Sequence, residues 1–180
     1  MIRSFLHKRI RRLEHGFGYD AGYLHEVLDV SLSAFLKFGM FQVMASHRDG
    51  VPRDAAFAAR LAATLSEDCG PCTQLVVDMA LKHGMEAGKL AALLRGDIEE
   101  AGADAELGFR FGIAIANNTA DTSALSEEVE RRFGKRALVS LSYAVACSRV
   151  YPALKRGLGH AAACSKIQVA ENSIIIRQAA

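Results

Sequence analysis

The sequence contains one short motif whose residue types and spacing could do chemistry, Cys69-Gly70-Pro71-Cys72. Two thiols three positions apart share one face at the start of a helix, so their sulfur atoms can come within bonding distance. Cys69 at an N-cap would place its sulfur among backbone N–H groups that lack partners inside the helix, which favours the thiolate. Pro71 is tolerated because the first turn has unused N–H groups. The motif therefore predicts reversible exchange between a dithiol and a disulfide.

Two other interpretations of the cysteines stand beside redox chemistry. Cysteine is among the most frequently buried residues, and Cys72 lies on the apolar stripe of the expected helix, which is also consistent with core packing. A structural zinc site needs four nitrogen or sulfur ligands, and neither Cys147 nor Cys164 has a Cys-x-x-Cys or His-x-x-x-His companion. The six histidines show no metal-ligand spacing either. We therefore expect no metal ion and no cofactor.

The composition of the chain indicates its structural class and its cellular compartment. The chain has 180 residues, 51% of them hydrophobic and 23% charged, a balance typical of one globular domain. With 22 basic and 20 acidic residues the net charge is only +2, so nothing predicts nucleic acid as a partner. The longest stretch without Asp, Glu, Lys or Arg, 137–148, is well below the ~18 residues of a membrane span. The N-terminus lacks a secretory pattern, so we expect a cytoplasmic protein with no membrane span.

The elements that must position the motif are helices. Apolar residues recur with helical spacing almost throughout, and we predict an all-α fold. In the first half of the chain we expect helices over 2–13, after Asp20 with a break at Gly39, around Phe41, from Pro52 to Leu65 and from Cys69 to His83. In the second half we expect a Leu-rich helix that ends before Gly96, a helix around Leu107–Ile115, a helix capped by Ser126 that ends at Gly134, and a helix over 136–150. Pro152 starts or kinks the last helix of the chain. Only 173–176 could form a strand.

Around the motif the sequence resembles a known superfamily. The segment 58–94, AARLAATLSEDCGPCTQLVVDMALKHGMEAGKLAALL, looks like the core of the alkylhydroperoxidase-D-like, carboxymuconolactone decarboxylase superfamily. The same Cys-Gly-Pro-Cys string occurs in thioredoxin-like proteins, but there it follows a strand, whereas here it follows a helix. The likeness implies an alkylhydroperoxidase-D-like helical domain at 51–164. We therefore expect an N-terminal helical extension with a basic start at 1–48 and a C-terminal tail at 165–180, all in one compact domain.

The resemblance also implies an activity and partners. Alkylhydroperoxidase members reduce peroxides with the two cysteines and assemble as homo-oligomers, usually trimers or hexamers. By match of motif, Cys72 would attack the peroxide and Cys69 would resolve the sulfenic acid. The helix-end argument instead makes Cys69 the more acidic thiol, and both assignments stay open. The expected partners are a small-molecule peroxide or a thiol/disulfide protein.

Three positions differ from the peroxidase pattern. Such members carry a Glu twelve residues before the first cysteine, a His four residues after the second and, in some, a His between the cysteines. Here Phe57, Val76 and Pro71 occupy these positions, and none of them can transfer a proton. His83 is about 16 Å beyond Cys72 along a helix. Glu67, next to the motif, is a candidate base, although an acid there also suits the positive end of the helix dipole.

The sequence therefore supports one leading hypothesis and two alternatives. The leading one is a thiol-dependent redox protein, either an atypical peroxidase or a disulfide reductase, that uses the Cys69–Cys72 pair. The first alternative is a non-catalytic oligomeric interaction protein that keeps the fold, because apolar Phe57 and Val76 would pack well. The second is a lyase like the carboxymuconolactone decarboxylases, which do not depend on a cysteine pair; the sequence offers no acid–base pair for it.

Overall fold

The chain is described by a computed structural model that places residues 2–160, 166–170 and 172–175, with the side chains of 166, 172 and 175 excluded. Over these residues the protein is all-helical apart from one small hairpin. Its elements are α1 (Ile2–Phe17), α2 (Gly22–Val30), α3 (Leu32–Ala45), α4 (Arg53–Ser66), α5 (Gly70–Lys82), α6 (Ala87–Arg95), a 3₁₀ turn (Ile98–Ala101), α7 (Ala103–Asn117), α8 (Thr122–Phe133), α9 (Lys135–Gly157), β1 (Lys166–Val169) and β2 (Asn172–Ile175). The predicted all-α class is confirmed, while the particular superfamily fold stays a prediction.

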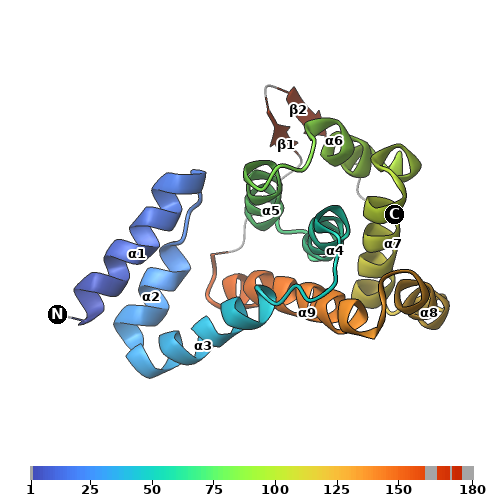
Figure 1. Ribbon diagram of the computed structural model, residues 1–180. Helices are drawn as coiled ribbons and strands as arrows, with labels where there is room; N and C mark the ends of the chain where they lie inside the picture. The colour runs from blue at the N-terminus through green and yellow to red at the C-terminus, as the bar shows by residue number, and fades with distance from the viewer. Residues whose placement is uncertain (1, 161–165, 171, 176–180) are drawn as a thin grey trace.

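Helix α4 is the central element of the body. It contacts α5, α7 and α9, and Figure 1 shows these helices arranged around it. Seven of its alanines and leucines and its single phenylalanine are fully buried or nearly so, which is possible because small side chains let neighbouring helices approach. The approach is closest at α7, where Gly108 lies against the backbone of Ala55 and Gly112 against Ala59. The position of α4 fixes where α5, with the cysteine motif at its start, begins.

Helices α1 to α3 form an arm beside this body. Figure 1 shows α1 and α2 lying to one side, with α3 leading back along α9. Ile10, Tyr19, Tyr23 and Leu28 are buried where the arm folds on itself and meets Leu75 of α5 and Leu154 of α9. The arm comprises most of the predicted 1–48 extension.

The hairpin covers part of the predicted C-terminal tail. β1 and β2 pair antiparallel, with Ile167 opposite Ile174 and Gln168 opposite Ser173. Ile167 and Val169 are fully buried and join the core cluster that contains Phe57 and Val76. The strand expected at 173–176 is observed as β2 over 172–175, and residue 176 lies outside the described residues. The described part of the predicted C-terminal tail therefore packs in the core of the body.

Several helix boundaries differ from the sequence prediction, and α1, expected over 2–13, extends to Phe17. The break after α2 falls at Ser31, not Gly39, because Ser31 is extended and its hydroxyl oxygen accepts a hydrogen bond from the Ala34 N–H at 3.2 Å. Ser126 does not cap α8, which begins at Thr122; its hydroxyl donates to the Thr122 carbonyl within the helix. Pro152 does not start a helix but lies buried inside α9, which runs to Gly157 rather than ending near 150; the predicted kink at Pro152 stays a prediction. Packing of α9 on α3, α4, α7 and α8 holds the helix together across the proline.

Among the described helices α9 alone is long and apolar enough to cross a membrane by length and composition. This is weak support for a span, because the core helix of a soluble protein passes the same test, and 44% of the apolar window of α9 is buried inside the protein. The predicted absence of a membrane span stays a prediction.

Candidate active site

The cysteine motif lies at the junction of α4 and α5. After α4 ends, Asp68 adopts a left-handed conformation (φ 48°) and turns the chain into Cys69, which is the extended N-cap residue of α5. Pro71 then occupies the first turn, as the sequence predicts. The Thr73 N–H and hydroxyl both donate to the Cys69 carbonyl, at 2.9 and 3.0 Å, and fix the start of the helix. The local sequence therefore places the two thiols at one helix end.

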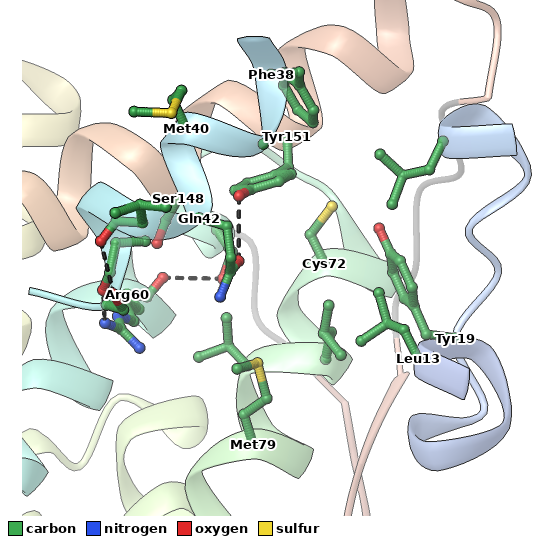
Figure 2. Close-up of a pocket in the computed structure, with 18 of the residues that line it drawn as sticks. Leu13, Tyr19, Phe38, Met40, Gln42, Arg60, Cys72, Met79, Ser148 and Tyr151 are labelled. Carbon is green, nitrogen blue, oxygen red and sulfur yellow. Dashed lines mark hydrogen bonds between the residues drawn. The ribbon is translucent and has the colours of Figure 1, made fainter. Parts of the chain in front are cut away.

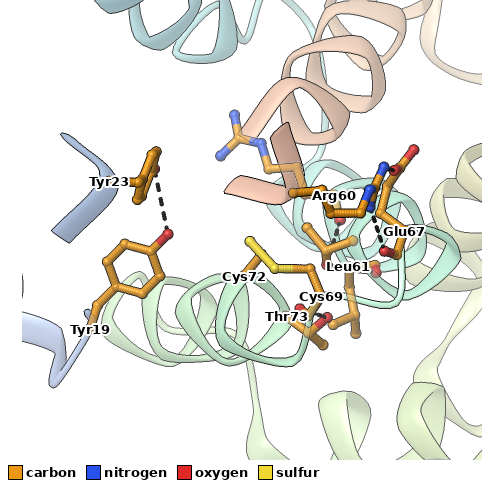
Figure 3. The surroundings of a disulfide bond; sticks show 10 residues. Tyr19, Tyr23, Arg60, Leu61, Glu67, Cys69, Cys72 and Thr73 are labelled. Carbon is orange, nitrogen blue, oxygen red and sulfur yellow. Dashed lines mark hydrogen bonds and ion pairs between the residues drawn. A yellow bond between two sulfur atoms is a disulfide. The ribbon is translucent and has the colours of Figure 1, made fainter. Parts of the chain in front are cut away.

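Cys69 and Cys72 form a disulfide in the structure, with their Cα atoms 5.3 Å apart (Figure 3). The predicted closeness of the pair is confirmed. Cys69 and Cys72 expose only 6% and 5% of their surface. Such burial shields the bond from bulk solvent, so any reactant must approach through a cavity.

A cavity of about 790 Å³ lies between the arm and the body, and Cys72 lines it, whereas Cys69 does not. Figure 2 shows the Cys72 sulfur facing this space, with Tyr151 on one side and Met79 on another. The arm contributes residues such as Leu13, Phe35 and Phe38, and the body contributes α4, α5 and α9. The volume lies within the range of small-molecule pockets.

Three tyrosine hydroxyl groups lie around this cavity. Tyr19 and Tyr23 line it, and the Tyr19 hydroxyl donates to that of Tyr23 at 3.5 Å (Figure 3). Burial raises the pKa of both tyrosines. Burial also raises the pKa of Tyr151 to about 12, and its hydroxyl donates to the Gln42 side-chain oxygen at 3.4 Å. All three hydroxyls stay protonated at neutral pH and act as hydrogen-bond donors rather than bases.

A cation also borders the cavity. Arg60 lies half-buried on α4, and one of its terminal nitrogens donates to the Ala45 carbonyl. Its guanidinium carbon is 5.5 Å from the centre of the Phe57 ring. Burial, followed by the nearby charge of Arg48, lowers the pKa of Arg60, which as an arginine still remains charged. This end of the cavity is therefore positive.

Glu67, the candidate base, points elsewhere. Its carboxylate accepts hydrogen bonds from Arg149 Nε at 2.6 Å and from an Arg156 terminal nitrogen at 2.5 Å, and it does not line the cavity with Cys72. Burial would raise the pKa of Glu67, but the hydrogen bonds from Arg156 and Arg149 outweigh it and lower the pKa below the ordinary value of 4.5. These contacts are those of an ion pair that ties the α4–α5 junction to α9. A catalytic role for Glu67 stays a prediction.

The Glu67 ion pairs make a pH-dependent contribution to stability. Because the folded state lowers the pKa of Glu67, the contribution is present in full above the ordinary value of 4.5 and is lost as pH falls through the lowered pKa. Glu67→Gln should lower the free energy of unfolding by about 1–2 kcal/mol at pH 7, measured by urea unfolding, and by progressively less in acid. Glu106→Gln, which removes the Glu106–Arg110 pair, a pair more exposed than those of Glu67, is the control and should cost less than about 0.5 kcal/mol. An equal loss for Glu67→Gln at pH 7 and in acid would contradict this account.

The three positions that differ from the peroxidase pattern carry no titratable group. Phe57 and Val76 are buried at 1% and 9% exposure in one core cluster, and both also line the cavity. His83 is exposed at the end of α5, and its ring stacks on Phe57 with centroids 5.6 Å apart. His83 therefore borders the same cavity as Cys72, although the sequence placed it far along the helix.

Sequence reasoning missed the tyrosines and Arg60. Tyr19 and Tyr23 belong to the segment before the predicted core, where the resemblance is loose, and only the three-dimensional fold brings them beside Cys72. The sequence around Arg60 does contain a signal of a buried charge. It is a lone cation within the apolar run 55–65, and a buried cation needs a partner.

Within the described residues, no group of three or more His, Cys, Asp or Glu side chains gathers as a metal would require. Comparison with known proteins adds no assignment: no family model, no curated protein and no solved structure matches the chain.

Proposed function

We propose that this protein is a thiol-dependent oxidoreductase that reduces a peroxide with the Cys69–Cys72 pair. The observation that carries the proposal is the disulfide at the start of α5, one sulfur of which lines a cavity large enough for a substrate. A disulfide used only for packing needs no such access. The positive start of α5 favours the thiolate form of a reduced cysteine there.

Access to the cavity supports Cys72 as the attacking thiol. Its thiolate would attack the terminal oxygen of the hydroperoxide R–O–OH, break the O–O bond and become a sulfenic acid, while RO⁻ leaves. The Tyr23 hydroxyl, which accepts from Tyr19 and keeps its own proton to donate, can stabilise the departing alkoxide, which takes up a proton to become ROH. The Cys69 thiol then attacks the Cys72 sulfur, the S–S bond forms, and the hydroxyl leaves as water with the thiol proton. An external dithiol supplies two electrons to reduce the disulfide again.

One observation favours the non-catalytic alternative. Phe57 and Val76 fill the positions of the peroxidase relay and pack in the core, so the cavity lacks the acid and histidine of that pattern. Under this alternative the cysteines react with peroxide no faster than a free dithiol. The lyase alternative has no carboxylate in the cavity lining to support it.

Thiol counting with peroxide tests the proposal. The fully reduced chain has four thiols, and one equivalent of an organic hydroperoxide should remove two of them, with the peptide containing 69–72 lighter by two hydrogen atoms in mass spectrometry. We expect this oxidation to be at least about 100-fold faster than that of a free dithiol, because the thiolate is favoured and the partner thiol is positioned. Oxidation at the rate of a free dithiol, or loss of thiols at Cys147 and Cys164 instead, would refute it.

A further inference from the structure

The lining of the cavity combines an apolar wall with unpaired positive charge. Ten of the 26 lining residues are leucine, phenylalanine or methionine, and no aspartate or glutamate lines the cavity within the described chain. The ionisable nitrogen bases that do line it are Arg9, Arg48, Arg60 and His83. An apolar cavity whose charges are all of one sign selects a ligand with an apolar body and one group of opposite charge.

The positive end has a donor that lacks a partner. The Nε atom of Arg60 is the only buried side-chain nitrogen or oxygen in the described residues without a hydrogen bond. Neither Arg60 nor Arg48 pairs with an acid there, although most other arginines of the body do. A buried donor without a partner is costly, and the guanidinium fork matches the geometry of a carboxylate. That Nε has almost no accessible surface, so it adds uncompensated positive charge at this end of the cavity rather than a direct contact. An anion would be held through the other guanidinium nitrogens of Arg60 and Arg48, the two arginines that line this end.

The order of residues along the cavity orients such a ligand. Figure 2 shows Arg60 and Ser148 at one end, Leu13 and Tyr19 at the other, and Cys72 between them. A charged group held at Arg60 would therefore place the middle of an attached hydrocarbon chain, rather than its charged end, beside the Cys72 sulfur.

We propose that the cavity binds an amphipathic carboxylate, with the carboxylate at Arg60 and Arg48 and the hydrocarbon chain running past Cys72 toward Leu13. Binding of such an acid depends on the cavity alone. The identity of the substrate rests in addition on the proposed function: it is then a long-chain acid carrying a hydroperoxide within its chain, reduced to the hydroxy acid by the step given above.

Binding is measured first, on the disulfide form of the whole chain and on the Cys69→Ser/Cys72→Ser variant, so that its outcome is independent of redox chemistry. Calorimetric titration with dodecanoate, methyl dodecanoate and dodecyl phosphate provides the comparison. We expect dodecanoate to bind at least about tenfold more tightly than its methyl ester to both forms. Equal binding of acid and ester, or no binding of either, would overturn the proposal, and tighter binding of dodecyl phosphate would overturn the carboxylate assignment.

Substitution then tests the two arginines. Arg60→Gln and Arg48→Gln should each weaken dodecanoate binding, by about tenfold for Arg60→Gln, and leave the methyl ester unchanged. Arg110→Gln, at an arginine of α7 outside the cavity, should change neither. If Arg60→Gln fails to fold, the Arg48→Gln variant and the comparison of acid with ester still test whether the cavity binds the carboxylate. Equal weakening of acid and ester would overturn the proposal.

A final experiment tests the substrate assignment separately from the proposed function. A hydroperoxide of a long-chain acid should show a KM at least about tenfold below that of its methyl ester, with a similar kcat. Binding of dodecanoate without oxidation of the cysteines by any peroxide would remove the proposed function and leave the carboxylate site standing. Equal KM values for acid and ester would instead show that the carboxylate does not determine substrate binding, while the proposal of peroxide reduction would stand.

Discussion

Replacing Cys72 with serine is expected to lower the rate of peroxide reduction at least about 100-fold. A serine hydroxyl is not ionised at neutral pH and does not form the sulfenic acid, so the first step has no nucleophile. Cys69→Ser should behave differently, because the attacking thiol is intact and only the resolving thiol is lost. It should reduce one equivalent of peroxide, accumulate a sulfenic acid at Cys72 and fail to turn over. Rapid-quench assays with a sulfenic acid probe measure both variants.

Cys147, a free cysteine among the described residues, provides the matched control. It is buried on α9, and burial raises the pKa of its thiol, which makes it a poor nucleophile. Cys147→Ser should keep the wild-type rate. The reverse pattern, with single-equivalent reduction by Cys72→Ser and none by Cys69→Ser, would make Cys69 the attacking thiol, as the helix-end argument alone suggested. Wild-type rates in both variants would exclude the pair from the reaction.

Gly108→Ala is expected to destabilise the fold by about 2–4 kcal/mol. A Cβ atom at position 108 would lie 2.3 Å from the Ala55 carbonyl oxygen and 2.7 Å from the Ala55 Cα. Both are backbone atoms of α4, so no side chain can rotate away and the two helices must separate. Because α4 carries the chain into the cysteine motif, the separation would also disturb the site. Urea unfolding followed by circular dichroism measures the loss.

Gly88→Ala tests whether the Gly108 effect comes from packing. Gly88 is also helical, in α6, but nothing lies within 4 Å of the Cβ that alanine would add. Helix propensity then favours alanine, and the variant should be more stable than wild type by up to about 1 kcal/mol. A loss at Gly108 no larger than the change at Gly88 would contradict the close approach of α4 and α7.

Sequence reasoning was most successful where structure is decided locally. Pro52 before α4, Gly84 after α5 and Gly96 after α6 act through their own backbone preferences, and the expected boundaries agree with the observed ones to within about two residues. The cysteine motif is equally local, so its closeness could be predicted. The boundary at Ser31 is local as well, because the Ser31 hydroxyl caps α3. The continuation of α9 through Pro152 instead depends on packing against other helices, which the spacing of apolar residues does not reveal.

The cavity could not be predicted for the same reason. Its walls come from the arm and from the body, which are far apart in sequence, and nothing in either segment alone specifies that they meet around Cys72. The mutual position of Tyr19, Arg60 and Tyr151 is a property of the tertiary fold. What the sequence could have shown is that a lone arginine in a run of small apolar residues needs explanation.

The covalent bond between Cys69 and Cys72 encloses a ring of only four residues. The entropy that a crosslink removes from the unfolded chain grows with the length of the enclosed loop, so this bond contributes little to holding distant parts of the molecule together. Reduction of this bond should therefore cost the fold only about 2 kcal/mol, less than the loss of a crosslink across a long loop, so the reduced form should keep the native architecture.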